Sequence, residues 1–375
     1  MTHQWSPEAH IDRRTLFRGA AGLGLTAAAG TLLPACGSGG RDQIESRAAG
    51  TTPVTQAGAG PTLETTSVRL HASAPVTCVA AQYMAEPFLR EQGFTDVQYP
   101  PGLAKDLPER FRSGDIDIGL GYAAFFLPMI EAGAPLVLLG GVHVGCWEII
   151  ATGDIKSLRD FKGKTVSIGG LTFTDGIFMA MTLASIGLDL HKDVKVVNYP
   201  PTEHARLLSS GEVDAVVAFP PLSNDLKAKN IGHVVINSMT DAPWSNYYCC
   251  TVAVQRSWME KNPVATKAAL RAILKGADVV AKDPDGTAQS MVAHGYTANE
   301  AYARQSLHEM PYGIWRDFEP ADSVRFYALR LKEAGLIHST PEQLIKRGTD
   351  FSYLAELKQE LGPAPQGGGT HVHHS

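Results

Sequence analysis

Cysteine is scarce in this 375-residue sequence, which contains only five. The spacing of Cys78, Cys146, Cys249 and Cys250 matches no CxxC pattern, so it does not indicate a zinc site. The adjacent residues Cys249 and Cys250 are poorly placed to form a disulfide with each other without strain. We therefore expect these four residues to be free, buried thiols rather than metal ligands.

Basic side chains are also in short supply, since 33 Lys and Arg stand against 38 Asp and Glu, a formal net charge of −5. No basic stripe with interleaved aromatic residues occurs, which excludes the usual nucleic-acid interface. The sequence has no Ser-His-Asp order and no nucleophile elbow, and Gly119-Leu120-Gly121 lacks the third glycine of a dinucleotide-binding motif. We expect neither an enzyme nor a bound cofactor.

The uncharged stretch near the N-terminus, GAAGLGLTAAAGTLL, is too short and too rich in Gly and Ala to span a bilayer well. Arg13 and Arg14 precede it, and LPAC, which ends at Cys36, follows it. This order predicts a twin-arginine signal peptide over residues 1–35. LPAC is similar to a lipobox, so we expect acylation of Cys36 and a membrane-anchored lipoprotein of the cell envelope. The alternative is a soluble exported protein in which Cys36 is incidental.

Two segments have too few apolar residues to form a core. Residues 36–65 are rich in Gly, Ser, Thr, Pro and Ala, a composition that predicts a flexible tether. Residues 362–375 carry His371, His373 and His374 after a glycine run. These histidines can hold a metal weakly, but a disordered tail is the simpler interpretation, and we assign no metal site there.

One phrase occurs twice in the remaining chain, as FRSGDIDIGL from Phe111 and as LSSGEVDAVV from Leu208. In both copies Ser-Gly follows a helical pattern, and Gly can take the left-handed conformation that caps a helix. Short aliphatic runs alternate with helical stretches around each copy, which predicts two α/β lobes with parallel strands. Residues 257–361 are nearly all helical by periodicity.

The two halves are joined by two extended stretches, residues 143–152 and 246–255. Their β-branched and aromatic content predicts strands that cross between the lobes and form a hinge. We therefore predict one lobe from residues 66–149 together with 247–361, and a second lobe from residues 150–246.

This order of elements, with FKGKTVSIGG, SGEVDAVVAF and a helical ending after a returning strand, resembles the periplasmic substrate-binding proteins of nitrate/sulfonate/taurine-type ABC importers. Those proteins share a fold with thiamine-pyrimidine precursor proteins, and the resemblance covers most of residues 66–361. It implies an α/β, two-lobed periplasmic-binding-protein fold (type II-like) with hinge strands and a helical C-terminal region. The implied function is the capture of a small molecule by a monomer that presents it to a membrane permease.

Two other functions stay open. Thiamine-pyrimidine synthases share this fold and have a cysteine-rich stretch similar to YYCC at 247–250, so a thiamine-pyrimidine-related enzyme or binder is one alternative. The export signal argues against the enzyme, because that chemistry belongs inside the cell. A ligand-sensing ectodomain is the other alternative, and it differs from an importer component only in its partner.

Ligands of open α/β sheets bind outside the carboxyl ends of the strands, where this chain offers hydroxyls, glycines and aromatic rings. Helices predicted to begin near Thr77 and Thr174 would also direct free amides at an anion. The predicted ligand-binding residues are Ser73, Thr77, Cys78, Tyr122, Ala123, Gly170, Thr172, Phe173, Thr174, Asp175, Phe219 and Tyr248.

These candidate loops contain neither Arg nor Lys, so a multiply charged anion would depend wholly on amides, hydroxyls and helix dipoles. A neutral or singly charged ligand, such as a sulfonate or a carboxylate, fits more easily. Glu148 and Asp175 can even select a cationic amine. His71 and His143 lie on predicted strands, where a structural role is the default.

Overall fold

A computed structural model describes residues 62–72, 76–102 and 106–363, all of which belong to one compact unit spanning residues 57–375. The predicted signal peptide, Cys36, Ser73 and the C-terminal histidines lie outside these described residues. Within them, no helix is both long enough and apolar enough to cross a membrane.

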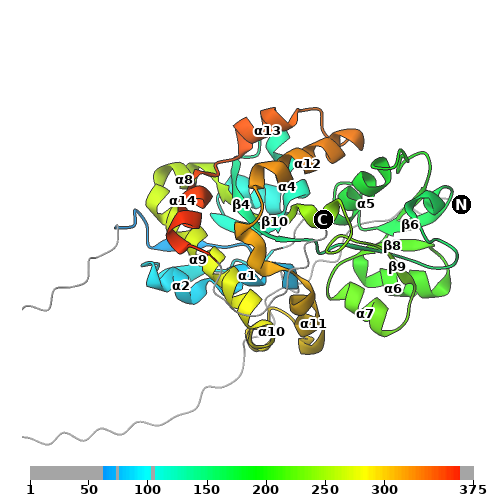
Figure 1. The fold of residues 1–375 in the computed structure, drawn as a ribbon, viewed down its shortest axis with the longest axis horizontal. Helices are drawn as coiled ribbons and strands as arrows, with labels where there is room; N and C mark the ends of the chain where they lie inside the picture. Colours follow the sequence, from blue (N-terminus) through cyan, green and yellow to red (C-terminus); the bar gives the residue numbers. More distant parts are fainter. Residues whose placement is uncertain (1–61, 73–75, 103–105, 364–375) are drawn as a thin grey trace, which may run out of the picture. The chain divides into compact units, whose positions relative to one another are not determined.

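Three β-sheets organise the described residues (Figure 1). A two-stranded parallel sheet pairs β1 with β2, a three-stranded sheet has the order β3-β10-β4, and a five-stranded sheet has the order β7-β6-β8-β5-β9. We call the three-stranded sheet the first sheet and the five-stranded sheet the second sheet. The strands are β1 (Ser67–Arg69), β2 (Asp96–Gln98), β3 (Ile118–Tyr122), β4 (Leu136–Val144), β5 (Glu148–Ala151), β6 (Thr165–Ile168), β7 (Lys195–Asn198), β8 (Ala215–Ala218), β9 (His233–Asn237) and β10 (Tyr248–Gln255).

Helices connect the strands and make up nearly all of the chain after β10, as the periodicity of that region predicts. The α-helices are α1 (Ala80–Tyr83), α2 (Glu86–Glu91), α3 (Leu107–Ser113), α4 (Ala123–Glu131), α5 (Thr174–Ala184), α6 (Pro201–Ser210), α7 (Leu222–Ala228), α8 (Arg256–Lys261), α9 (Pro263–Lys282), α10 (Pro284–Ala293), α11 (Glu300–Glu309), α12 (Pro320–Glu333), α13 (Pro341–Gly348) and α14 (Ser352–Leu361). The described residues also form the short 3₁₀ turns η1 (Thr77–Val79), η3 (Leu158–Phe161), η4 (Trp244–Asn246) and η5 (Tyr312–Arg316).

The twice-occurring phrase makes the same helix-to-strand turn in both halves. Gly114 ends α3 with φ 79°, and Gly211 ends α6 with φ 73°, so both glycines are left-handed caps as predicted. The hydroxyl of the preceding serine donates to a helix carbonyl at 3.2 Å in each copy. The two turns therefore share a backbone conformation as well as a sequence pattern.

An aspartate after each cap ties the turn to a neighbouring parallel strand. Asp117 accepts the backbone N–H of Arg69 at 2.8 Å, and its own N–H donates to the Arg69 carbonyl at 2.9 Å. Asp214 repeats both bonds with Thr165, at 2.7 and 2.8 Å. The Asp117 carboxylate thus fixes the start of β3, and the Asp214 carboxylate fixes the start of β8.

The chain passes between the first and second sheets twice. It leaves β4 at Val144 to enter β5, and it returns from β9 to β10 by way of η4. The stretches predicted to be extended contain β5 and β10, which lie in different sheets. In Figure 1 the labels β4 and β10 mark the first sheet, and β6, β8 and β9 mark the second sheet to its right; the two crossings connect them.

Candidate functional site

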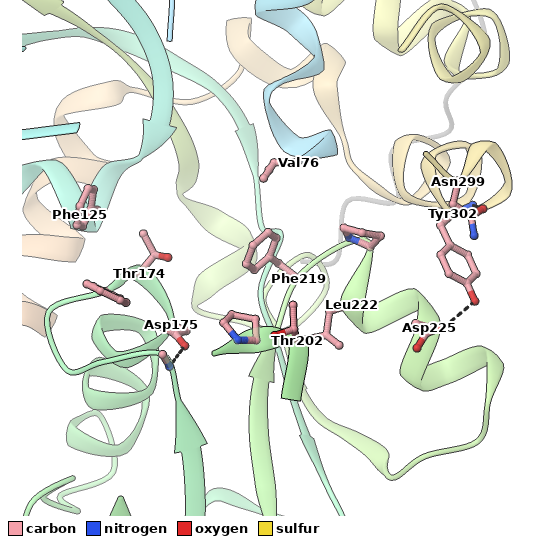
Figure 2. A pocket seen from close by; sticks show the side chains of 14 residues that line it. Val76, Phe125, Thr174, Asp175, Thr202, Phe219, Leu222, Asp225, Asn299 and Tyr302 are labelled. Carbon is pink, nitrogen blue, oxygen red and sulfur yellow. Dashed lines mark hydrogen bonds between the residues drawn. The ribbon is translucent and has the colours of Figure 1, made fainter. Parts of the chain in front are cut away.

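A cavity of about 760 Å³ opens at the carboxyl ends of the parallel strands of the second sheet. Residues from the connections after β6, β7 and β8 form one side, and residues that precede η1 or lie on α4 and α11 face them across the cavity (Figure 2). Its lining consists of Val76, Phe125, Gly169, Phe173, Thr174, Asp175, Pro201, Thr202, Phe219, Pro221, Leu222, Asp225, Asn299 and Tyr302.

The connection from β6 to α5 is shaped by Asp175, which is buried. Its carboxylate accepts backbone N–H groups from Gly169, at 2.5 Å, and from Gly176, at 2.9 Å. A Cβ atom at Gly176 would lie 2.2 Å from the Gly170 carbonyl oxygen, so only glycine allows this close approach. Burial raises the pKa of Asp175, while these backbone bonds oppose the shift. Both carboxylate oxygens therefore serve the loop itself.

Phe173 is the prominent apolar group at the cavity mouth, with 39% of its surface exposed. Together with Phe125 it also lines a second hollow of about 340 Å³, to which Thr172 and Arg112 contribute. The two hollows are neighbours that share these two rings.

Three polar contacts join α7 to α11 at the far end of the cavity. The Tyr302 hydroxyl donates to Asp225 at 3.1 Å, the Ser306 hydroxyl donates to Asn224 at 2.9 Å, and Lys227 lies 3.4 Å from Glu309. Figure 2 shows Tyr302 reaching toward Asp225 from the opposite side. We call these contacts the α7–α11 latch.

Glu148 stands behind the latch rather than in the cavity lining. It is buried at the start of β5 and accepts hydrogen bonds from Lys227 and Asn237, both at 3.2 Å. Burial raises the pKa of Glu148, and the neighbouring Lys227 ammonium opposes the rise. The Lys227 ammonium therefore balances the charge of the Glu148 carboxylate.

Some of the predicted ligand-binding residues meet in this region and others do not. Phe173, Thr174, Asp175 and Phe219 line the cavity, and Thr172 lines the second hollow. The side chains placed elsewhere among the described residues are those of Thr77, Cys78, Tyr122, Ala123 and Tyr248, while Gly170 lies beneath Phe173 in the same loop.

Tyr122 and Tyr248 are two predicted ligand-binding residues whose rings do not line the cavity. The ring centroids of Tyr122 and Trp147 lie 5.5 Å apart. Those of Trp147 and the cavity residue Phe219 lie 4.9 Å apart. The Tyr248 hydroxyl instead faces the helical region, 2.8 Å from the Trp315 carbonyl oxygen. Tyr122 is therefore one layer behind the cavity, and Tyr248 points away from it.

Sequence reasoning missed the residues that close the cavity from the other side. Asn299 and Tyr302 belong to a helix whose periodicity marked it only as part of the helical ending. Asn299 accepts the N–H of Tyr302 at 3.0 Å as the N-cap of α11. An Asn before a helical pattern was the available signal, but it locates a helix start and not a contact with α7.

The charged side chains among the described cavity-lining residues are acidic. The described residues that line the cavity include the carboxylates of Asp175 and Asp225 and no Lys, Arg or His. Asp225 is paired with Lys229 at 2.8 Å and with Tyr302. The lining thus presents rings, proline faces and a few hydroxyls, as the lack of basic residues in the predicted loops indicated.

Residues 104–294 of the chain match the NMT1-like family. The nitrate/nitrite binding protein NrtA of Synechococcus elongatus is 25% identical over 186 residues, which are 48% of this chain and 40% of that protein. The chain therefore spans less than half the length of this relative.

Solved structures resemble the chain more completely. The periplasmic nitrate-binding protein NrtA from Synechocystis PCC 6803 has a TM-score of 0.67 at 15% identity, covering 82% of this chain and 93% of its own. The periplasmic aliphatic sulphonate binding protein SsuA from Escherichia coli has a TM-score of 0.60 at 16% identity, covering 83% and 96%. These likenesses confirm the predicted periplasmic-binding-protein fold. The names of both proteins describe binding.

Proposed function

Because the chain belongs to the NMT1-like family, we propose that it is an exported solute-binding protein of an ABC importer. It captures a small organic molecule in the cavity at the carboxyl ends of β6 and β8 and presents it to a membrane permease. Support comes from the position of the cavity, which is where ligands of open α/β sheets bind. The names of the structural neighbours NrtA and SsuA also support a binding role.

The cavity closes, in this proposal, by movement of two lobes about the crossings between the first and second sheets. One lobe comprises residues 66–149 with 247–361, and the other comprises residues 150–246. The α7–α11 latch supports this division, because α7 follows a strand of the second sheet while α11 belongs to the helical region after β10. Hinge closure of this kind is a common way for two-lobed proteins to enclose a ligand.

The ligand class rests on one observation, the absence of any Lys, Arg or His among the described residues that line the cavity. A small inorganic anion needs several donors to replace its water, and this lining offers few. A molecule with an apolar or flat body suits the rings of Phe173 and Phe219. If the ligand carries a single sulfonate or carboxylate, the Thr174 hydroxyl in the cavity is placed to orient it, and Thr172 and Arg112 lie in the neighbouring second hollow.

A ligand-binding role for Thr77, Cys78, Tyr122, Ala123, Gly170 and Tyr248 remains a prediction. Lipid anchoring at Cys36 is likewise part of the proposal. It places the protein on the membrane surface beside its permease.

The experiment is a thermal-shift screen of the full chain followed by calorimetry, since a ligand that binds only the folded state raises the unfolding midpoint. The panel pairs aryl and alkyl sulfonates and carboxylates with uncharged analogues of equal size, and includes nitrate. We expect the compounds with an apolar body to raise the midpoint and nitrate to leave it unchanged.

The variant Phe219→Ala should then weaken binding of the best compound at least about tenfold, because a buried aromatic contact contributes more than 1.4 kcal/mol. The matched control is Leu329→Ala, which truncates an apolar side chain that is 47% exposed on α12. A midpoint raised by nitrate alone, or equal binding by Phe219→Ala, would contradict the proposed ligand class.

A further inference from the structure

Three cysteines from distant parts of the sequence meet in the interior. The Sγ atoms of Cys78, Cys146 and Cys250 all lie within 4.8 Å of one another. Cys78 comes from η1, Cys146 from the connection between β4 and β5, and Cys250 from β10. All four cysteines among the described residues are free and buried, as expected from the sequence, but their convergence was not predicted.

An irregularity in β10 brings the third thiol to this point. The register of β10 against β4 shifts on both sides of Cys250, which pairs with His143 on β4 and Tyr122 on β3. Side chains of a regular strand alternate between its two faces, and a bulge breaks that alternation. The neighbouring Cys249 consequently also approaches the cluster, with its Sγ atom 3.0 Å from that of Cys146.

The backbone around Cys146 is held in place by a buried serine. The Ser238 hydroxyl oxygen accepts the N–H groups of Cys146 at 3.2 Å and Trp147 at 2.8 Å. Gly145, with φ 57°, makes the turn, and a Cβ there would lie 2.3 Å from the Met239 Cα atom. This segment is thus fixed before any ligand arrives at the thiol.

His143 lies against the cluster, where its side chain hydrogen-bonds Cys250, and against the backbone on both sides of it. Its Nε2 atom lies 2.8 Å from the Cys78 carbonyl oxygen and its Nδ1 atom 3.1 Å from the Val144 carbonyl oxygen. Both ring nitrogens therefore face hydrogen-bond acceptors. The Tyr312 hydroxyl donates to the Thr77 carbonyl at 3.0 Å and holds the same turn from the other side.

We propose that Cys78, Cys146 and Cys250 form a binding site for one copper(I) ion. Metal–thiolate bonds near 2.3 Å place three sulfurs about 4 Å apart in a trigonal site, which the present separations allow with little movement. Thiolates select soft ions such as copper(I). Zinc prefers four ligands, whereas the set that is mutually close here contains three. Binding replaces three S–H protons, which leave to solvent.

The site is separate from the proposed ligand cavity, because none of the four cysteines lines that cavity. It lies one layer behind it, since Cys146 directly precedes Trp147, whose ring packs on Phe219. The inference therefore does not depend on the identity of the solute, and it stands or falls independently of the importer function.

The test titrates the full chain, reduced and kept anaerobic, with copper(I) in competition with bicinchoninate, and measures X-ray absorption of the loaded protein. We expect one copper(I) per chain with three sulfur neighbours. Cys78→Ser, Cys146→Ser and Cys250→Ser should each weaken copper(I) binding by more than about a hundredfold, beyond the effect of an outer-shell change. Cys249→Ser is the matched control and should retain binding.

Circular dichroism of each variant checks that it folds, and the absorption spectrum of the unsubstituted chain remains decisive if a variant does not. The proposal is overturned by the absence of copper(I) uptake, by a nitrogen- or oxygen-dominated copper shell, or by loss of binding in Cys249→Ser alone. Preferential one-to-one binding of zinc would overturn it as well. So would a Cys146–Cys249 disulfide in chain isolated without reductant, because that bond consumes one of the three ligands.

Discussion

The Tyr302 hydroxyl on α11 donates a hydrogen bond to the Asp225 carboxylate on α7, at a distance of 3.1 Å. Both residues line the cavity, so this bond closes the cavity wall between two segments far apart in the sequence. The contacts of Ser306 with Asn224 and of Lys227 with Glu309 lie beside it. These three contacts connect α7 and α11 where both helices border the cavity.

The first prediction concerns this latch. Tyr302→Phe keeps the ring and removes the hydroxyl, so it should lower the affinity for the screened ligand about two- to tenfold, as expected for one hydrogen bond. Small-angle scattering of the ligand-free variant should also show a larger radius of gyration. Tyr199→Phe is the control, because Tyr199 is 40% exposed. Equal affinity in all three proteins would show that the latch does not contribute to closure.

The second prediction concerns the repeated caps. Gly114 and Gly211 have positive φ values and open space around the position of a Cβ, so an added methyl group tests the backbone alone. Gly114→Ala and Gly211→Ala should each lower the free energy of unfolding by about 1–2 kcal/mol. The control is Gly313→Ala, whose Cβ would meet only that of Ala281, at 3.5 Å. Urea unfolding measures all three, and a loss for Gly313→Ala as large as the others would refute the argument from φ.

The third prediction concerns acid stability. Burial, together with the positive charge of Arg110, lowers the pKa of His71 from 6.5 to about 4. As the pH falls from 6.5 towards 4, the unfolded chain binds a proton at His71 that the folded chain does not, so stability falls over this window. The loss approaches about 3 kcal/mol at its lower end.

Urea unfolding at pH 7 and pH 4.5 tests this contribution. His71→Gln, which cannot take up that proton, should reduce the difference between the two free energies of unfolding. The control is His191→Gln at an exposed position. If His71→Gln shows the same difference as the unsubstituted chain, His71 is not a source of acid lability.

The fourth prediction concerns the membrane anchor. Cys36→Ala removes the thiol that acylation requires, so the exported chain should move from the membrane fraction to the soluble fraction. Ser38→Ala, two residues away, should leave the chain in the membrane fraction. Cell fractionation with immunodetection gives the result, and continued membrane attachment of Cys36→Ala would rule out the lipobox interpretation.

Local patterns predicted much of the fold. The turn at Ser113-Gly114 and its counterpart at Ser210-Gly211 depend on a glycine after a helix, which is a feature of neighbouring residues. Phe173 and Asp175 were found because they follow a strand end in the sequence, and strand ends define the edge where the cavity opens.

Features that depend on tertiary docking were not accessible in the same way. Tyr302 reaches the cavity only because α11 packs beside α7, and its own helical pattern carries no sign of that contact. Cys250 meets Cys78 because β10 is irregular on both sides of Cys250, whereas alternation along a regular strand would separate neighbouring side chains. Tyr248 was predicted as a cavity residue, but its ring lies over Gly141 and its hydroxyl faces η5.

The paired turns also bear on how the chain folds. Arg69 and Asp117 are 48 residues apart, and Thr165 and Asp214 are 49 residues apart. The entropy lost on closing a loop grows only with the logarithm of its length, so the two closures restrict the chain to almost the same extent. In each half an aspartate carboxylate accepts a peptide N–H, and the aspartate's own N–H donates to the carbonyl of the same partner residue. Neither half therefore has an advantage in chain entropy when its first parallel strands come together.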